Sequence, residues 1–342
     1  RGFEVYNLYL KGRYYWNQRS ESGLRKSVEL FRQAIERDPT YSKPYAGLAD
    51  ANLLLGVYGL SAPDEVMPKA RDAAERALAI DNQSAEVFSS LACLEAVYEW
   101  DWEASEEHFR RALAIDPNYA TAHHWYAVNV LAPTGRFEEA AVELRQAEDR
   151  DPLSLAIHAS SGLLLYYWRR YEPAIAELTR TLELDPRFAV AHFFLGQALT
   201  QLGRHKEAIA ELEAAVRLSG GAAEMRAALA YGNALAGNTD AALRILRELE
   251  AAAAHRYVSP VLSAQIHAGL GDLGLAIEGL ERASRWRAAD LLWIGVRPTF
   301  DPLRNEPAFN ALLDQLHLPN VHARAADGDA SDGAELDPTR FL

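Results

Sequence analysis

Residues 189–220 alternate between apolar and polar positions in a way that predicts two short amphipathic helices joined by a turn at 202–204. The apolar or small positions lie three or four residues apart, at Leu195, Gly196, Leu199, Ala208, Leu212 and Ala215. This spacing places one apolar stripe along each helix. Because two such helices cannot bury their stripes alone, we expect the same unit to recur beside them.

The small residue Ala208 has counterparts along the whole chain, at Ser27, Ala70, Ser105, Ala140, Ala174, Ala242 and Ala276. Every step between Ala140 and Ala276 is 34 residues, and the two steps before Ala140 are 35. The first step is 43 residues, because a Gly/Pro-rich insertion at 56–68 separates the two helices of the second unit. A helix-turn-helix period of 34 residues is that of the tetratricopeptide repeat, and we count eight units.

The chain resembles the tetratricopeptide family at the family's motif positions. The small pair of the first helix is matched at residues 48–49, 91–92, 126–127, 161–162, 195–196 and 229–230. The bulky residue of the second helix is matched at Phe31, Phe109, Leu144, Leu178, Leu212, Leu246 and Leu280. The closing proline follows an aspartate at Pro39, Pro117, Pro152 and Pro186, and is missing at Asn82, Gly220 and Ala254. Asp-Pro ends a helix because proline disfavours the α conformation in the residue before it.

The resemblance implies an all-α fold, a right-handed superhelix (α-solenoid) of about eight repeats over residues 1–286. Residues 287–319 are expected to form a linker and a capping helix, with Phe309, Leu312, Leu313 and Leu316 covering the open apolar face of the last repeat. The Asp/Gly/Ala-rich residues 320–342 are expected to form a flexible acidic tail.

Two segments carry a narrower resemblance. Residues 5–55 and 299–316 are similar to the C-terminal tetratricopeptide half of bacterial signalling and transcriptional-regulator proteins, whose N-terminal halves are winged-helix regulators, kinases or nucleotide cyclases. None of those N-terminal domains is present in this chain, so none of their chemistry is carried over. The first residue is Arg, which leaves open whether the chain begins inside a longer gene or lacks a leader.

Composition excludes several classes of function. The net charge of −13 disfavours non-specific binding to nucleic acid or to an anionic membrane surface. The single cysteine, Cys93, excludes an internal disulfide framework, and its place on a helix predicts a buried or groove-facing thiol. No apolar run is long enough to span a bilayer and no signal peptide is visible, so we expect a cytoplasmic protein.

Candidate chemistry along the chain has a structural interpretation in each case, and we predict no catalytic, cofactor-binding or metal-binding residue. His123, His158 and His192 occupy one position of three successive first helices; a metal ladder is one interpretation, and packing into the interior of each repeat is the favoured one. The motif G-x-G-x-x-G at 269–274 falls in an inter-helix turn rather than after a strand. At residues 99–102, Glu-Trp-Asp-Trp could suggest a sugar site, but we expect the tryptophans to staple the turn and Asp101 to cap the next helix.

The concave face of the superhelix is the predicted site of function, since first helices line it. The predicted groove residues are His124, Val128, Leu131, Leu163, Tyr166, Tyr167, Phe193, Gln197, Thr200, Tyr231 and Gln265. This apolar, aromatic-rich set predicts a non-enzymatic scaffold that binds a peptide or an amphipathic helix, with aromatic side chains as anchors. The lysines and asparagines that clamp an acidic C-terminus in one tetratricopeptide subclass are absent at the matching positions.

Three alternatives remain open. The chain could be a regulatory or oligomerisation module that controls an N-terminal signalling or DNA-binding domain outside it. It could be an enzyme, although Asp50, Glu86 and His124 are scattered on the inner face and no nucleophile has an obvious base. The tail at 320–342 could occupy the groove of its own chain or of a neighbour. The oligomeric state and the partner's identity stay open.

Overall fold

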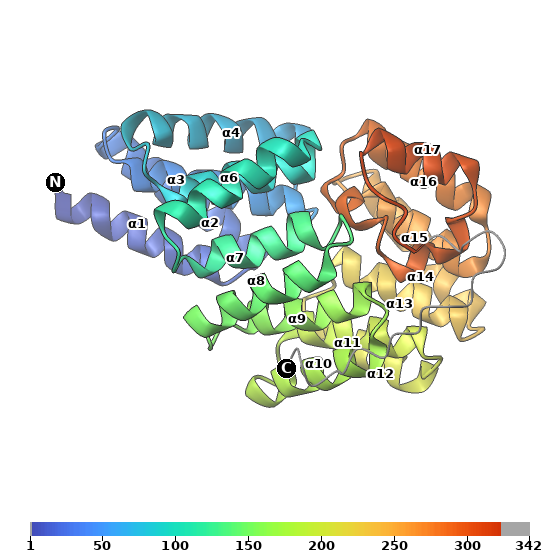
Figure 1. Cartoon of the computed structure of the whole chain (residues 1–342). Coiled ribbons are helices and arrows are strands. Elements are labelled where there is room, and N and C mark those ends of the chain that lie inside the picture. The colour runs from blue at the N-terminus through green and yellow to red at the C-terminus, as the bar shows by residue number, and fades with distance from the viewer. Residues whose placement is uncertain (1, 323–342) are drawn as a thin grey trace.

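The computed structural model describes residues 2–322, which form eight helix pairs (Figure 1). The pairs are α1 (Gly2–Asn17) with α2 (Glu21–Arg37), α3 (Ser42–Val57) with α4 (Pro63–Ile80), α5 (Ala85–Leu94) with α6 (Trp102–Ile115), α7 (Ala120–Tyr126) with α8 (Phe137–Arg150), α9 (Leu155–Tyr167) with α10 (Tyr171–Leu184), α11 (Ala189–Gln201) with α12 (His205–Leu218), α13 (Ala223–Leu235) with α14 (Thr239–Ala253), and α15 (Pro260–Leu270) with α16 (Leu273–Arg285). Two 3₁₀ helices, η3 (Ala289–Trp293) and η4 (Pro298–Leu303), and the helix α17 (Pro307–Gln315) follow. The predicted all-α superhelix of helix-turn-helix repeats is confirmed.

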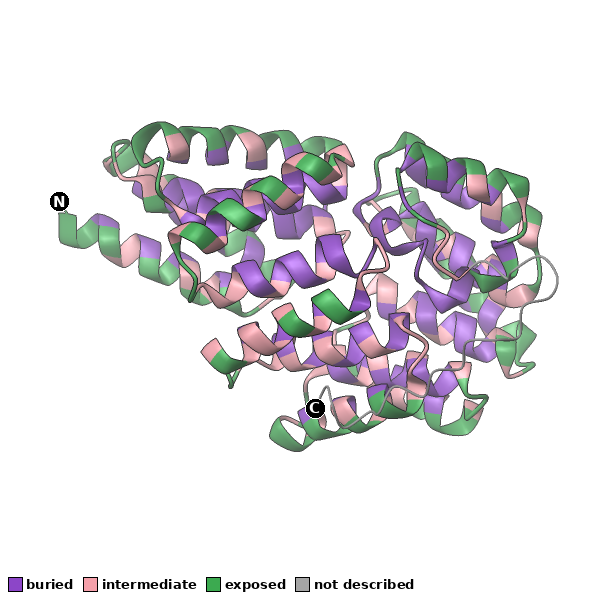
Figure 2. Ribbon diagram, in the orientation of Figure 1, coloured by how far each residue is buried: buried purple, intermediate pink, exposed green. Residues whose placement is uncertain are grey.

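The chain curls so far that its last helices return to its first half. Figure 1 shows α15, α16 and α17 beside the ends of α4 and α6, and buried residues line the inside of this curl (Figure 2). A hydrogen bond joins the two regions, because the Trp102 indole N–H donates to the Leu316 carbonyl at 2.9 Å. Within the described residues, no helix is long and apolar enough to cross a membrane.

In the fifth and sixth repeats, the two helices close on a contact between a bulky side chain and a glycine. A Cβ atom added at Gly162 would lie 2.5 Å from Leu178 Cγ, and one added at Gly196 would lie 2.5 Å from Leu212 Cγ. Leu178 and Leu212 are fully buried. The small pair and the bulky residue of the repeat motif therefore touch, and glycine is required wherever the bulky residue fills the space of a side chain.

The two 35-residue steps have a structural cause. In the third and fourth repeats, 14 positions separate Leu91 from Ser105 and Tyr126 from Ala140, against 13 between Ser161 and Ala174. The extra residue is absorbed in a π-helical turn at the end of the first helix, η1 (Glu95–Glu99) after α5 and η2 (Ala127–Leu131) after α7. A π-turn accommodates one added residue without breaking the helix.

The aspartate side chain closes the turn at Asp-Pro positions, and it does so at one junction without proline as well. The Asp38 and Asp185 carboxylates accept the backbone N–H two residues on, at 3.0 and 2.8 Å. At the second junction of the chain, where Asn82 replaces proline, the Asp81 carboxylate accepts the Gln83 N–H at 3.0 Å. The aspartate alone therefore supplies the turn, and this junction keeps the geometry of the others.

We predict that Gly162→Ala lowers the free energy of unfolding by about 1–3 kcal/mol, because its methyl group meets Leu178 in a closed interface. The matched control is Gly274→Ala in α16, where an added Cβ meets nothing within 4 Å. That change should be neutral or stabilise by up to about 1 kcal/mol. Urea unfolding followed by circular dichroism measures both, and equal effects of the two variants would contradict this account of the interface.

Candidate functional site

The predicted groove residues are mostly buried. The buried ones are Leu131, Leu163, Tyr166, Tyr167, Phe193, Thr200, Tyr231 and Gln265, while His124, Val128 and Gln197 are half-buried. Phe193 packs between repeats, in an apolar cluster with Leu212 and Met225.

The chain's own C-terminal segment covers the concave surface of the fourth and fifth repeats. We call residues 287–322 the strap. Its residues Ala289, Leu292, Trp293 and Val296 share one apolar core cluster with Leu131, Leu163, Tyr166 and Tyr167 of the predicted groove. The groove that the sequence predicts as open is therefore filled, at these residues, by an apolar stretch that the sequence analysis treats as a linker.

Polar contacts fix the strap in place. The Trp293 indole N–H donates to the Val128 carbonyl at 2.9 Å. Farther along the strap, the His322 ring lies 3.0 Å from the Tyr167 carbonyl through Nε2 and stacks on Phe137. Carbonyls at the ends of helices lack an internal partner, and the strap supplies additional donors to two of them.

Arg169 is the side chain that ties the array to the strap most directly. Its guanidinium donates to the Val296 carbonyl and to the Asp301 carboxylate, each at 2.6 Å. Its backbone has φ of 65°, in the left-handed region. The same turn position carries glycine in the flanking repeats, at Gly135 and Gly203. A non-glycine residue there costs of order 1 kcal/mol, which marks the position as one retained for its side chain.

In the third repeat, Trp100 is a second non-glycine residue at this left-handed turn position that contacts the strap. It occupies the corresponding turn position with φ of 61°, and the Arg287 guanidinium lies 4.8 Å from its ring centroid. Its neighbour Trp102 binds the Leu316 carbonyl. The expected cap is present, since the Asp101 carboxylate accepts the Ala104 N–H at 3.1 Å. The two tryptophans therefore anchor the C-terminal segment.

One buried and two half-buried charged residues lie where the strap passes the later repeats. Arg297 is buried, and its guanidinium lies 3.8 Å from the Glu224 carboxylate. Asp290 accepts a hydrogen bond from Ser259 at 2.7 Å. Burial raises the pKa of both carboxyls, while the charge of Arg297 opposes this rise in each case. An unpaired charge here would be costly, so the strap depends on this cluster staying together.

The inner face of the first three repeats carries a polar cluster instead of an apolar groove. The Arg13 guanidinium donates to the buried Asp50 carboxylate at 2.9 Å, and Ser90 donates to the other Asp50 oxygen. Burial raises the pKa of Asp50 and of the neighbouring Glu86. The structure therefore brings together two of the acids that the sequence shows as scattered, but Asp50 is fully engaged by partners within the chain.

The remaining candidate residues have structural partners. His124 lies 2.8 Å from the Ser160 hydroxyl through its Nε2 atom. The Cys93 thiol is buried, and burial raises its pKa, which keeps it protonated and unreactive. The three aligned histidines lie in separate repeats, each with Nε2 on the carbonyl of the proline that closes the preceding repeat. Gly271 ends α15 with φ of 85°, so the G-x-G-x-x-G motif is a helix-ending turn, as predicted.

The predicted acidic tail begins inside the described residues and continues beyond them. Val321 packs against the turn at Gly135, where an added Cβ would lie 2.7 Å from Val321 Cγ2. Residues 323–342, on which the hypothesis of an internal tail ligand rests, lie outside the described part of the chain.

Comparisons with known proteins agree with this geometry. Residues 160–223 match the sequence profile of the tetratricopeptide repeat family. Human IFIT1, solved as a dimer with PPP-AAAA, superposes with a TM-score of 0.59 at 17% identity, over 78% of this chain and 69% of that one. Pseudomonas aeruginosa PilF matches with a TM-score of 0.45 at 20% identity, over 64% of this chain and 96% of that one. The profile match and the IFIT1 superposition thus agree that the chain has the fold of a tetratricopeptide-repeat solenoid.

One regulator shares part of the sequence. The transcriptional regulator HilA of Salmonella typhimurium is 23% identical over 160 residues, which is 47% of this chain and 29% of HilA. The chain therefore matches less than a third of that protein's length. The similarity fits the resemblance to bacterial regulators seen in residues 5–55 and 299–316.

We predict that His124 lowers the free energy of unfolding by about 2 kcal/mol as the pH falls from 7 to 5, and that His124→Gln removes this contribution from the pH dependence. Burial, followed by the charge of Arg19, lowers the pKa of His124 from 6.5 to about 3. Between these two values the unfolded chain binds a proton at this ring that the folded chain does not, so acid favours unfolding. Urea titrations at pH 7 and 5 measure the effect. His255→Gln is the control, because that ring is exposed, and an unchanged pH dependence in His124→Gln would contradict the assignment.

Proposed function

We propose that this protein is a non-enzymatic scaffold for protein–protein interaction that binds a peptide or a helix on its concave surface. The tetratricopeptide fold supports the general role. The finer claim concerns the predicted groove residues of the fourth to eighth repeats, with Phe193 left out because it packs between repeats.

The observation that carries the proposal is that this surface already holds a short helical segment. The 3₁₀ turn η3 places Trp293 against the first helices, with the indole 8% exposed and its N–H on a backbone carbonyl. A buried aromatic anchor with one directional hydrogen bond is the way a groove holds a peptide. Tyr166, Tyr167 and Leu163 form the apolar wall around it.

In this proposal the strap and the external ligand compete for one surface. The strap is tethered, so it has a high local concentration and reduces the apparent affinity for a free ligand. A ligand therefore binds strongly only when the strap is released. Replacing Arg169 should release the strap with little damage to the array, because glycine occupies the same turn position in the neighbouring repeats.

A second candidate is a regulatory or oligomerisation module that acts on a signalling or DNA-binding domain outside this chain. The similarity to HilA favours it. An apolar stripe on α1 offers it a surface, because Phe3, Tyr6, Leu10 and Tyr14 are 80, 46, 45 and 65% exposed. These residues are three or four positions apart and share one face of the helix. We favour groove binding over this second candidate, because the groove already holds the Trp293 side chain of the strap.

For groove binding, we predict that peptides selected from a random library against the full-length Arg169→Gly protein bind the parent about tenfold more weakly. The reason is that the parent's strap still occupies the surface. Fluorescence anisotropy measures the affinities, and circular dichroism checks folding. Arg187→Ala, which removes an exposed arginine elsewhere, should behave like the parent.

A blocking variant tests the location. Arg169→Gly combined with Val128→Arg places a charge on the half-buried groove position and should abolish binding of the selected peptides. Peptides that bind the combined variant as tightly as Arg169→Gly alone would show that they bind elsewhere.

For the second candidate, the expected outcome is concentration-dependent self-association through α1, which Leu10→Glu removes. Burying the stripe against another copy would release apolar surface from water, and a glutamate in its centre would prevent this. Sedimentation velocity at micromolar concentrations measures the self-association of the parent and of Leu10→Glu. A monomeric parent would remove the support that this surface gives to the second candidate.

A further inference from the structure

The fifth repeat departs from a pattern that its two neighbours share. In the fourth repeat His123 Nδ1 lies 2.6 Å from the Glu143 carboxylate, and in the sixth His192 Nδ1 lies 2.6 Å from Glu211. The corresponding pair in the fifth repeat is His158 and Glu177, because Glu177 lies 34 positions from both Glu143 and Glu211. Glu177 is instead paired with Arg180, at 2.8 Å. The His158 ring thus lacks the carboxylate partner that the other two rings have.

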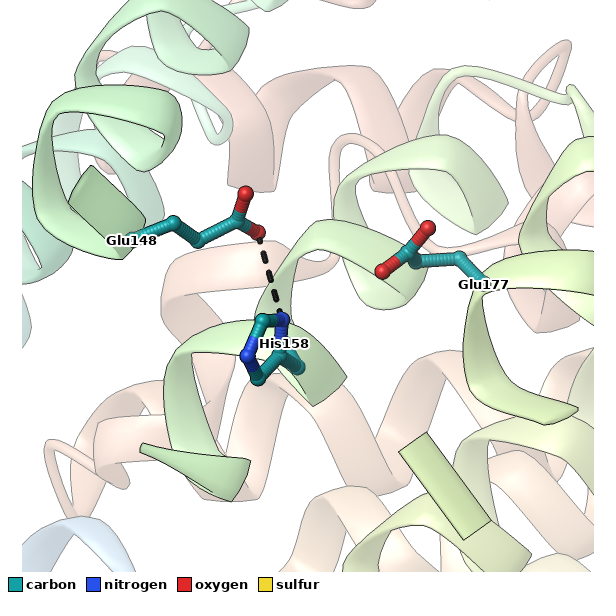
Figure 3. A group of neighbouring side chains, drawn as sticks. All are labelled: Glu148, His158 and Glu177. Carbon is teal, nitrogen blue, oxygen red and sulfur yellow. Dashed lines mark ion pairs between the residues drawn. The ribbon is translucent and has the colours of Figure 1, made fainter. Parts of the chain in front are cut away.

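A second carboxylate approaches His158 from the preceding repeat. Glu148 of α8 lies with Oε1 3.8 Å from His158 Nδ1, longer than a hydrogen bond. Figure 3 shows the carboxyl groups of Glu148 and Glu177 pointing toward the ring from two different helices. One ligand atom from each of the three residues lies within 4.8 Å of the other two.

Glu148 occupies a position of the second helix that is apolar in the neighbouring third and fifth repeats. The matching residues are Leu113 and Leu182, and the residues they face, Tyr126 and Leu195, are apolar and share a cluster with them. Between the fourth and fifth repeats the same pair is Glu148 and Ser161, joined by a hydrogen bond at 2.6 Å. Replacing an apolar contact by a half-buried carboxylate sacrifices hydrophobic stabilisation, which calls for a compensating interaction.

The hydrogen bonds leave Nδ1 of the His158 ring free to bind a cation, while the Glu148 oxygen that faces it accepts a hydrogen bond from Ser161. His158 Nε2 donates to the Pro152 carbonyl at 2.9 Å, so in the neutral ring Nδ1 carries the lone pair. Metal-binding histidines commonly donate their other ring N–H to a backbone carbonyl in this way. Burial and the nearby charge of Glu148 both raise the pKa of Glu177, while Arg180 opposes the rise. Two carboxylates repel at this distance, and a divalent cation would reverse that repulsion.

We propose that Glu148, His158 and Glu177 bind one divalent transition-metal ion, such as Zn²⁺, between the fourth and fifth repeats. One nitrogen and two oxygen ligands suit such an ion, with water in the fourth position because all three residues are half-buried. Tetrahedral ligands at about 2.1 Å from the ion lie about 3.4 Å apart, so the side chains close by less than about 1.5 Å. The bound ion would join α8, α9 and α10 and stiffen the junction between the fourth and fifth repeats.

The test titrates the full-length protein with Co²⁺ and follows visible absorption, with Zn²⁺ displacement as the second readout. The expected result is one equivalent of strongly absorbing, low-symmetry Co²⁺ that Zn²⁺ displaces. His158→Gln and Glu148→Gln should each weaken binding by about 100-fold or more. The matched control is His192→Gln, which removes the ring at the same position of the sixth repeat and should leave binding unchanged.

Two results would overturn the proposal. One is a parent protein that binds no Co²⁺ with micromolar affinity at pH 7.5. The other is an equal loss in His158→Gln and His192→Gln, which would place the ion elsewhere or reflect a general effect of unfolding. Circular dichroism of each variant separates these cases. Glu177→Gln adds a variant that keeps the ring and its packing, and it should also lose the Co²⁺ absorption.

Discussion

The structure depends on one contact repeated along the chain, the bulky side chain of each second helix set against a small residue of the first. Leu178 and Leu212 fill the space that a side chain at Gly162 or Gly196 would need. Phe31 does the same against two glycines, Gly12 and Gly47. This close approach fixes the angle between helices, and stacking the angle eight times makes the array curl until its end meets its own third repeat.

That curl brings the strap to the concave surface, and the turns between helices are adapted to receive it. Glycine is the residue with the least steric cost at the left-handed turn position, yet Arg169 and Trp100 occupy it in two repeats. Both side chains contact the C-terminal segment. The array and the strap therefore form one structure, in which these long-range contacts compensate the local backbone strain.

The repeat pattern was enough to predict the helix pairs and the turns between them, because these depend on periodicity within 34 residues. The filling of the groove could not be predicted in this way. It depends on residues more than a hundred positions apart, such as Val128 and Trp293. The signals were an apolar run at 289–296 in a supposed linker and an arginine where neighbouring repeats have glycine. Glu148 and Glu177 gave a similar signal, visible only when each repeat is compared with its neighbours.

The central claim is that the strap closes the concave surface of the fourth and fifth repeats. Hydrogen exchange measured by mass spectrometry on the parent and on Arg169→Gly tests it most directly. Our account predicts that exchange in the variant accelerates in the strap at 289–303 and in the groove helices at 124–131 and 163–167, while α2 and α4 keep their protection. Unchanged protection in both the strap and the groove would contradict it, and would show that the array holds its shape without this contact.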